Sequence, residues 1–285
     1  MEYKKFLILG GDRRMAYTAR YLTEQGYAVG AYANHCAEGI SDVVSMANLG
    51  DAMDLYDNII MGIPFTRDGC TMYAPLCQET ITTDHILDLT EPRHSFAVGQ
   101  AGDFLTSCIK RGASCTDYGR REDFALYNAV PTAEGVLALL IGNTPVAISD
   151  SSILILGYGR IGKALAAMLR NLGASVTASA RKATDFAMMD IAGIRSITTG
   201  NYGELEHFDA VVNTIPYSTA DEGFYVQLGE GTVVIDASSS PGYMDRDCAE
   251  RHGVSVIEAF GLPGKIAPAT SGKIIAKTVM DIFRQ

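Results

Sequence analysis

The feature that most constrains the fold is a glycine pattern at the end of an apolar run. The run ends at Leu156, and Gly157, Gly159 and Gly162 follow in the spacing G-x-G-x-x-G, ahead of a helix-like stretch over residues 163–171. In a strand-turn-helix the first glycine allows the turn, the second lets the backbone approach a pyrophosphate, and the third lets the helix pack closely. The pattern predicts a dinucleotide-binding unit; the alternative is a turn that needs its glycines only for packing.

The end of the next expected strand, over residues 175–179, bears on the choice of dinucleotide. A domain selective for NAD places an acidic residue about 20 positions after the glycines, where it binds the ribose 2′-hydroxyl. Here the strand ends in Ser179, Ala180, Arg181 and Lys182. A hydroxyl and two cations suit a 2′-phosphate, so the sequence predicts NADP(H) in preference to NAD(H), against an ordinary basic helix start.

Two further loops of this half follow expected strands. One loop follows the strand over residues 208–213 and should pass the nicotinamide ribose; the other follows the strand over residues 232–236 and should face the ring. The serines 238–240 of the second loop could instead cap the next helix. The expected cofactor contacts are Gly157, Tyr158, Gly159, Arg160, Ile161, Gly162, Ser179, Arg181, Lys182, Asn213, Thr214, Ile215, Pro216, Ala237 and Ser238.

The chain begins with a second strand-turn-helix whose turn differs. An apolar strand ends at Leu9, and Gly10-Gly11-Asp12 then leads to Arg13 and Arg14 at the start of a helix. The turn lacks the fingerprint spacing. It suits an anion-binding turn for a substrate carboxylate, and it equally suits a helix start with two solvated arginines.

The remaining candidate residues lie in loops that follow expected strands over residues 58–64 and 86–90. Ligands of open parallel α/β sheets bind outside the carboxyl ends of the strands, which favours these loops as a substrate crevice. For each arginine the alternative is an exposed loop residue. The expected substrate contacts are Arg13, Thr66, Arg67, Thr90, Arg93, Ser239 and Lys265.

Alternating strands and helices predict an α/β protein with two doubly wound parallel-sheet domains. The expected N-terminal domain is flavodoxin- or Rossmann-like, binds substrate and covers residues 1–130, and a C-terminal helix over residues 270–285 packs back on it. The expected NADP-binding Rossmann domain covers residues 131–269 and opens with a helix from Pro131 to Ile141.

Composition excludes several partners. The net charge of −10 disfavours nucleic acid and anionic membranes. Six scattered cysteines predict reduced thiols in a cytoplasmic protein, with no metal site. We expect no membrane span, because no apolar run approaches the ~18 residues that one needs.

Four stretches resemble the family of dipicolinate synthase A subunits: residues 128–135, 155–162, 235–242 and 261–272. The last, Gly-Leu-Pro-Gly-Lys-Ile-Ala-Pro-Ala-Thr-Ser-Gly, is the most specific. The resemblance implies an enzyme of the mother-cell cytoplasm of sporulating bacteria. It would oxidise a dihydrodipicolinate-level intermediate of the lysine pathway, a small dicarboxylate, to dipicolinate. Its partner would be the flavoprotein B subunit of the same enzyme.

Two other functions stay open, and so does a homo-oligomeric state. The chain could be a stand-alone NADP-dependent dehydrogenase of a small hydroxy or amino acid, or a non-catalytic NADPH-binding scaffold for the flavoprotein. It lacks the Arg, Glu and His set of the D-2-hydroxyacid dehydrogenases, whose plan it resembles. His207 and His252 look like surface residues. The catalytic acid or base is therefore not identified.

Overall fold

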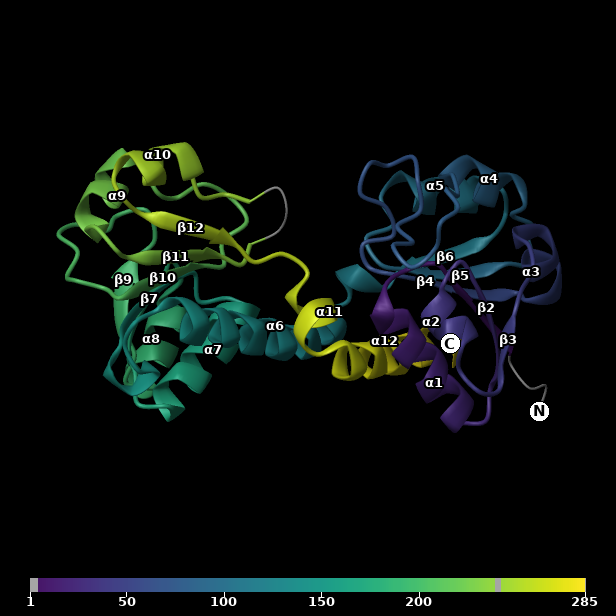
Figure 1. Cartoon of the computed structure of the whole chain (residues 1–285), viewed down its shortest axis with the longest axis horizontal. Helices are drawn as coiled ribbons and strands as arrows, with labels where there is room; N and C mark the ends of the chain where they lie inside the picture. Colours follow the sequence, from purple (N-terminus) through teal and green to yellow (C-terminus); the bar gives the residue numbers. More distant parts are fainter. Residues whose placement is uncertain (1–4, 239–241, 285) are drawn as a thin grey trace. The chain divides into compact units, whose positions relative to one another are not determined.

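The computed structural model describes residues 5–238 and 242–284, and the chain forms two compact units. Unit 1 comprises the chain up to Asn128 together with the chain from Ala267 onward. Unit 2 runs from Ala129 to Ile266. Each unit is built around its own six-stranded parallel sheet with helices on both faces (Figure 1). The predicted α/β class with two doubly wound domains is confirmed.

The sheet of unit 1 has the strand order β3-β2-β1-β4-β5-β6, which is the 3-2-1-4-5-6 order of the Rossmann fold. Its strands are β1 (Lys5–Leu9), β2 (Ala28–Tyr32), β3 (Val43–Ser45), β4 (Asn58–Met61), β5 (Ser95–Val98) and β6 (Ser114–Asp117). Its helices are α1 (Arg13–Glu24), α2 (His35–Glu38), α3 (Leu49–Leu55), α4 (Thr83–Asp88), α5 (Asp103–Lys110), the 3-10 turn Tyr118–Arg120 and α12 (Pro268–Arg284).

Strand β1 shows how this sheet buries both faces. Phe6 and Ile8 point to the face covered by α1, α2 and α12, whereas Leu7 and Leu9 point to the face covered by α3, α4 and α5. All four side chains are essentially inaccessible to solvent. The sequence of β1 is therefore continuously apolar, as parallel strands buried on both faces are.

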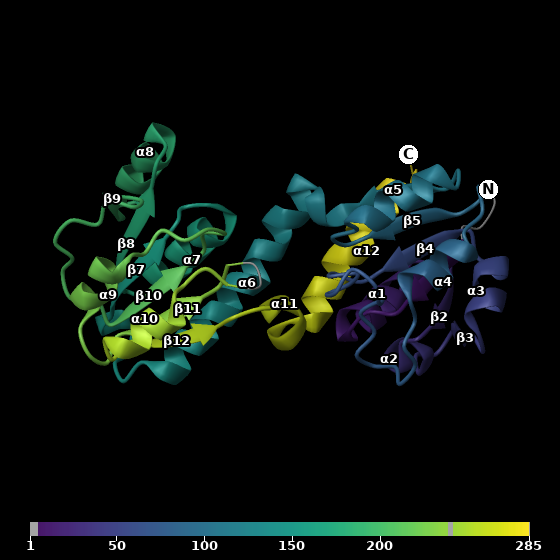
Figure 2. The same cartoon turned by 90° about the horizontal axis from the view of Figure 1, so that it is seen from above.

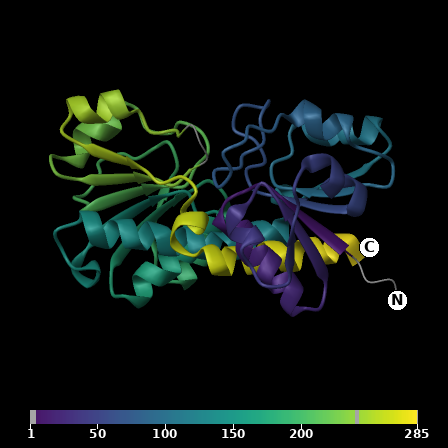
Figure 3. The ribbon, with the colours of Figure 1, turned by 45° about the vertical axis from the view of Figure 1, so that its right-hand side comes forward.

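Helix α12 returns from the end of the chain to lie against α1 (Figures 2 and 3). The two backbones approach closely at Gly272, where a Cβ atom would stand 2.4 Å from the carbonyl oxygen of Arg14. The Thr18 hydroxyl donates to the Gly272 carbonyl at 3.0 Å. The expected packing of the C-terminal helix on the first unit thus depends on a glycine at this crossing.

The sheet of unit 2 has the order β12-β11-β10-β7-β8-β9, again 3-2-1-4-5-6 counted within the unit. Its strands are β7 (Ser152–Leu156), β8 (Ser175–Ala180), β9 (Arg195–Thr198), β10 (Ala210–Asn213), β11 (Val233–Asp236) and β12 (Ser255–Glu258). Its helices are α7 (Arg160–Asn171), α8 (Ala183–Ile191), α9 (Glu222–Leu228), α10 (Arg246–Arg251) and α11 (Leu262–Ile266), with a 3-10 turn at Ile148–Asp150. Ile153 and Ile155 face α7 and α8, while Leu154 and Leu156 face α9 and α10.

The expected strand over residues 86–90 is wrong. These residues belong to helix α4 and the turn after it, and the strand comes later, as β5. Thr82 caps the helix, because its hydroxyl accepts a hydrogen bond from the backbone N–H of His85. Thr90 ends the helix with its hydroxyl bonded to the Ile86 carbonyl.

Helix α6 (Glu122–Asn143) begins nine residues before the predicted start at Pro131, which lies inside it. By length and composition alone this helix could cross a membrane. Its apolar residues have another use in the structure. Phe124 belongs to the core of unit 1, whereas Ala133, Val136 and Leu140 belong to the core of unit 2.

Candidate functional site

The glycine turn of unit 2 has the geometry that a dinucleotide requires. Gly157 has a φ of +96°, which disfavours any residue with a Cβ atom. At Gly162 a Cβ atom would stand 2.1 Å from the carbonyl oxygen of Gly157. At Gly159, by contrast, a Cβ atom would have no described neighbour within 4 Å. The turn is therefore packed beneath Gly157 and Gly162 and open above Gly159.

Helix α7 begins directly after this turn without a side-chain cap. Its N-cap residue is Gly159, which has no side chain and so makes no side-chain cap. The first N–H groups of the helix carry the positive end of the helix dipole and suit a phosphate. Of the neighbouring residues, Arg160 is exposed and Ile161 half-buried, whereas Tyr158 is buried in the core. The Tyr158 side chain contributes to the packing of the core.

The loop after β10 packs against the glycine turn. The Thr214 hydroxyl donates to the Leu156 carbonyl at 2.9 Å, and Ile215 contacts the position where a Gly157 side chain would stand. Asn213 is buried and bonded within the protein through both ends of its amide, to Ile215 and Asp236. Pro216 is exposed. The structure thus brings residues 214–216 beside the turn, with Asn213 as their support.

Asp236, at the end of β11, organises the next loop and was not among the residues expected from the sequence. Its buried carboxylate accepts five hydrogen bonds: from the Asn213 amide at 3.0 Å, from the N–H and hydroxyl of Ser238 at 3.1 and 2.6 Å, and from the N–H groups of Tyr243 and Met244 at 2.7 and 3.0 Å. Burial favours a raised pKa, but these donors hold the pKa of Asp236 below its ordinary value.

Asp236 holds described residues on either side of the serine loop, with Ser238 before it and Tyr243 and Met244 after it. Because the Ser238 hydroxyl already donates to Asp236, it supports the loop, and Ala237 is buried beside it. Ser239 lies outside the described residues. A pocket of about 210 Å³ near Asp236 is lined by four carboxylates and one arginine, so it does not suit a pyrophosphate.

The residues expected to bind a 2′-phosphate divide into two groups. Ser179 is inaccessible to solvent, and its hydroxyl accepts hydrogen bonds at 3.0 Å from the Gly157 N–H and the Thr199 hydroxyl. It therefore holds the turn in place. Arg181 and Lys182 are exposed at the carboxyl end of β8, with the Arg181 guanidinium 5.2 Å from the ring centroid of Tyr217.

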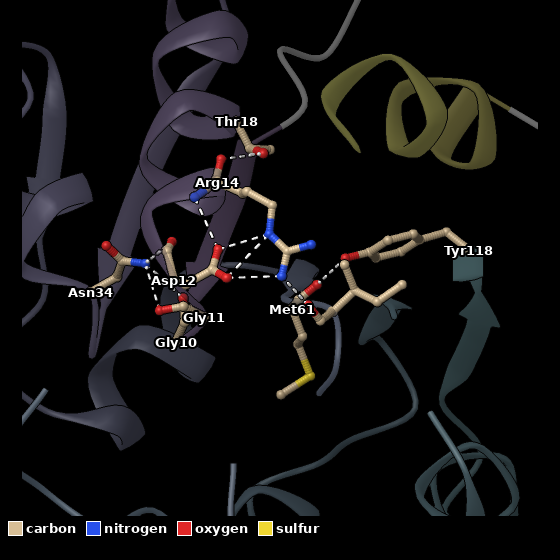
Figure 4. A network of polar contacts seen from close by, with 9 residues as sticks. Gly10, Gly11, Asp12, Arg14, Thr18, Asn34, Met61 and Tyr118 are labelled. Atoms are coloured by element: carbon tan, nitrogen blue, oxygen red, sulfur yellow. Dashed lines mark hydrogen bonds and ion pairs between the residues drawn. The ribbon is translucent and has the colours of Figure 1, made fainter. Parts of the chain in front are cut away.

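The first turn of unit 1 is closed by its own carboxylate (Figure 4). Asp12 caps α1 by accepting from the N–H of Arg14 at 3.0 Å, and it also binds the Arg14 guanidinium at 2.8 Å. The Asn34 amide donates to the carbonyls of Gly10, Gly11 and Asp12. A phosphate cannot use this helix start as it can that of α7. Arg13, the arginine expected to bind substrate, is exposed.

The loop after β4 forms a pocket of about 340 Å³ in unit 1. Arg67 lines it and lies 4.0 Å from the ring centroid of Tyr73, which also lines it. Thr66 is occupied inside the loop, where its hydroxyl bonds to Asp68 and to the N–H of Gly69. Lys265, in helix α11 of unit 2, is exposed.

Thr90 and Arg93 lie at the opposite ends of the unit 1 strands from Arg67. Both precede β5, so they are at the amino ends of the strands, because residues 86–90 form no strand. Arg93 binds Glu91 and Asp57 at 2.8 Å, and also the backbone carbonyls of residues 53 and 54. The argument that placed these two residues in a substrate crevice therefore fails.

The two histidines of unit 2 each lie near a carboxylate. His207 is exposed near Asp209, and His252 pairs with Glu222 at 3.2 Å. Glu222, Cys248 and His252 bring three ligand atoms within 4.8 Å of one another, the one such group among the described residues. All six cysteines are free thiols.

Comparison with known proteins shows which proteins this chain resembles. Residues 5–118 match the family model of the N-terminal domain of the dipicolinate synthase A subunit. The A subunit of dipicolinate synthase from Bacillus subtilis (strain 168) is 28% identical over 288 residues, which cover 99% of this chain and 96% of that protein. The chain is a relative of the dipicolinate synthase A subunit.

Solved structures agree with this relationship. The crystal structure of the dipicolinate synthase A chain from Bacillus subtilis is 27% identical with a TM-score of 0.86, covering 100% of this chain and 97% of that one. The A-subunit structure from Bacillus halodurans is 26% identical with a TM-score of 0.86, covering 99% and 98%. The fold also matches an L-alanine dehydrogenase at 12% identity and a TM-score of 0.64, covering 98% and 88%.

Proposed function

We propose that this chain is the NADP(H)-linked subunit of a dipicolinate synthase. It oxidises a dihydrodipicolinate-level intermediate of the lysine pathway to dipicolinate, together with the flavoprotein B subunit, in the mother-cell cytoplasm during sporulation. The observation that carries the proposal is the open glycine turn before the uncapped helix α7, in a chain whose whole length resembles the A subunit.

The residues of unit 2 fit a dinucleotide. The first N–H groups of α7 would hold the pyrophosphate, with room above Gly159 for its approach. Arg181 and Lys182 directly follow β8, at the position where the ribose 2′ group of a bound dinucleotide would lie. No acidic residue stands at the end of this strand, which supports NADP(H) over NAD(H). When bound, the nicotinamide ring supplies a hydride acceptor.

The substrate chemistry demands little of the protein besides placement. Oxidation of a dihydropyridine ring is favoured by aromatisation, so the chain must orient the dicarboxylate and accept a proton. Among the loop arginines expected from the sequence, Arg67, in its pocket at the carboxyl end of β4, still suits a carboxylate. Arg93 does not fit that role.

The decisive test supplies the purified chain with NADP⁺ and the aldol product of pyruvate and aspartate semialdehyde, with and without the flavoprotein. Dipicolinate is followed by its near-ultraviolet absorbance. Formation that requires this chain supports the proposal, and dependence on the flavoprotein assigns the activity to the complex. No dipicolinate in any combination, with NADPH still bound, rejects the proposal.

A stand-alone dehydrogenase is the second candidate, favoured by the likeness of the fold to L-alanine dehydrogenase. It predicts turnover of nucleotide by this chain alone with a small hydroxy or amino acid. The same assay without flavoprotein, run with a panel of such acids, separates the two functions.

A scaffold for the flavoprotein is the third candidate. It predicts tight NADPH binding, and an undiminished effect on flavoprotein stability, after replacement of Arg67 by Ala. Loss of dipicolinate formation in that variant, with NADPH still bound, would exclude a purely structural role.

A further inference from the structure

We infer that Arg14, and not its neighbour Arg13, binds a carboxylate of the substrate in unit 1. This inference rests on the proposed function, because it names a binding residue for the small dicarboxylate. The observations concern the environment of the Arg14 guanidinium, shown in Figure 4.

The Arg14 side chain is held rigidly although it carries a charge. It is only 8% exposed. Its Nε donates to both carboxylate oxygens of Asp12, at 2.9 and 3.2 Å, and its Nη2 donates to Asp12 at 2.8 Å and to the Ile63 carbonyl. Because both Nε and Nη2 are hydrogen-bonded, the plane of the guanidinium group is held in a single orientation.

The third nitrogen, Nη1, has no hydrogen-bond partner within the described part of the chain (Figure 4). Every described side-chain nitrogen or oxygen that is fully buried does have a partner. Nη1 must therefore reach solvent. A cation that is otherwise enclosed presents two N–H donors at the surface, in a fixed direction.

The position of Arg14 is that of a ligand-binding residue in an open parallel sheet. The turn before it follows β1, and Ile63 follows β4, so the guanidinium lies at the carboxyl ends of two adjacent central strands. The Arg67 loop meets the same turn, because the N–H of Gly11 donates to the Tyr73 carbonyl at 2.9 Å. Arg14 and Arg67 therefore both lie on the side of unit 1 where the carboxyl ends of its strands are.

The arrangement suits a carboxylate better than a phosphate. Asp12 already occupies the start of α1 and balances one positive charge, so a phosphate would find neither the helix N–H groups nor an excess of charge. An N–H group of the fixed Nη1 can donate to one carboxylate oxygen, and charge-assisted hydrogen bonds of this kind are strong when the donor is held in place. Arg13 is exposed and free to move, and so lacks this preorganisation.

The test compares Arg14→Gln with the matched control Arg13→Gln in the full chain loaded with NADP⁺. Calorimetry measures the dissociation constants of dipicolinate and of picolinate, which has one carboxylate fewer. We expect the wild type and Arg13→Gln to prefer dipicolinate about tenfold or more, as one charge-assisted hydrogen bond provides. In Arg14→Gln the preference should fall to near one, with NADPH affinity unchanged.

The outcomes separate this inference from the proposed function. A preference retained in Arg14→Gln, or lost in Arg13→Gln, overturns the role of Arg14 alone. A wild-type chain that binds NADPH but neither pyridine acid overturns the proposed function and this inference with it.

A second measurement covers a failure of Arg14→Gln to fold. In a crystal structure of the wild-type chain with dipicolinate, a carboxylate oxygen within hydrogen-bond distance of Arg14 Nη1 supports the inference. A dipicolinate whose carboxylates contact only other residues overturns it.

Discussion

The three glycines of the unit 2 turn differ in what surrounds them, and so their replacement should have different effects. Gly162 faces the Gly157 carbonyl at a distance that no side chain tolerates, whereas Gly159 faces open space and has an ordinary φ of −84°. Gly162 is therefore needed for the packing of the turn, whereas Gly159 is the glycine that the proposed dinucleotide would approach.

We expect Gly159→Val to leave the free energy of unfolding within about 0.5 kcal/mol of the wild type, because a Cβ atom at this position meets nothing within 4 Å. NADPH affinity should fall at least about tenfold, because the side chain occupies the approach of the pyrophosphate. Urea unfolding and titration of NADPH fluorescence measure the two effects. The matched variant Gly162→Ala should in addition lose about 3 kcal/mol in free energy of unfolding, because its Cβ atom would clash with the Gly157 carbonyl oxygen. Normal NADPH binding by Gly159→Val would contradict the fingerprint assignment.

The proposed preference for NADP(H) rests on two exposed cations, Arg181 and Lys182. Arg181→Ala combined with Lys182→Ala should lower NADPH affinity about tenfold or more and leave NADH affinity nearly unchanged, because only the 2′-phosphate needs the two charges. Competition binding of the two nucleotides measures the ratio. Replacement of Lys163 by Ala is a suitable control, because this nearby cation already pairs with Asp185 at 2.8 Å. An unchanged ratio in the double variant would show that selectivity resides elsewhere.

Asp236 offers a test that depends on pH. Its pKa is lowered in the folded state, so its carboxylate contributes stability above the ordinary value of 3.8, and that contribution is lost as the pH falls through the lower folded-state value. Asp236→Asn replaces an acceptor of five hydrogen bonds by a group with two donors and should cost about 3 kcal/mol at pH 7.

Urea unfolding at pH 7 and at successively lower pH checks this prediction. The difference between wild type and Asp236→Asn should shrink below about pH 4, the ordinary range of an aspartate. A difference that stays constant with pH would mean that the charged form of Asp236 is not what holds the loop.

Single residues also mark what the sequence could and could not predict. The glycine roles were predictable, because they follow from the absence of a Cβ atom at fixed spacing. The choice between Arg13 and Arg14 was not, because it depends on which side of α1 faces Asp12 and Ile63. Asp236 was missed although an Asp at the end of a strand commonly bonds the backbone two residues on, as it does here at Ser238.

At the scale of elements, the strands buried on both faces were predicted best. A short apolar run is ambiguous between strand and helix, and Ile86 to Leu89 was assigned wrongly for that reason. The Thr82 cap, three residues before His85, was the overlooked helix signal. The sequence places a helix start at Pro131, but in α6 this proline lies mid-helix, although proline is usually unfavourable there.

Two helical glycines test the packing of elements. Gly272→Ala should destabilise unit 1 by about 3 kcal/mol, because its Cβ atom would stand 2.4 Å from the Arg14 carbonyl where α12 crosses α1. Gly142→Ala, near the end of α6, meets nothing within 4 Å and should stabilise the chain by up to about 1 kcal/mol. Thermal unfolding of both variants gives the comparison. Equal effects of the two substitutions would rule out a close crossing at Gly272.

At the scale of the whole molecule, two sheets of the same strand order have different helix starts. In unit 1 Asp12 caps the start of α1, whereas in unit 2 the N-cap residue of α7 is Gly159, which has no side chain. A strand order shared by both units therefore does not imply two nucleotide sites. Under the proposed function, the different N-cap residues explain why unit 2 would take the dinucleotide and unit 1 the carboxylate substrate.

The path of the chain allows a last prediction, because unit 1 needs the C-terminal segment from Ala267 onward, whereas unit 2 is one continuous segment. Removal of the chain from Ala267 onward takes from unit 1 the apolar side chains Ile275, Val279 and Phe283, which fill its core against α1. Unit 1 should unfold, because its β1 face loses its cover, while unit 2 keeps every element of its own sheet.

Hydrogen exchange of the truncated chain, with and without NADPH, measures the two units separately. We expect protection to be lost over β1 and β4, and to be retained and increased by NADPH around the glycine turn of unit 2. The full-length Gly142→Ala variant serves as a folded control. Loss of NADPH binding on truncation would show instead that the dinucleotide site needs an intact unit 1, and the two units could then no longer be treated as separate folding units.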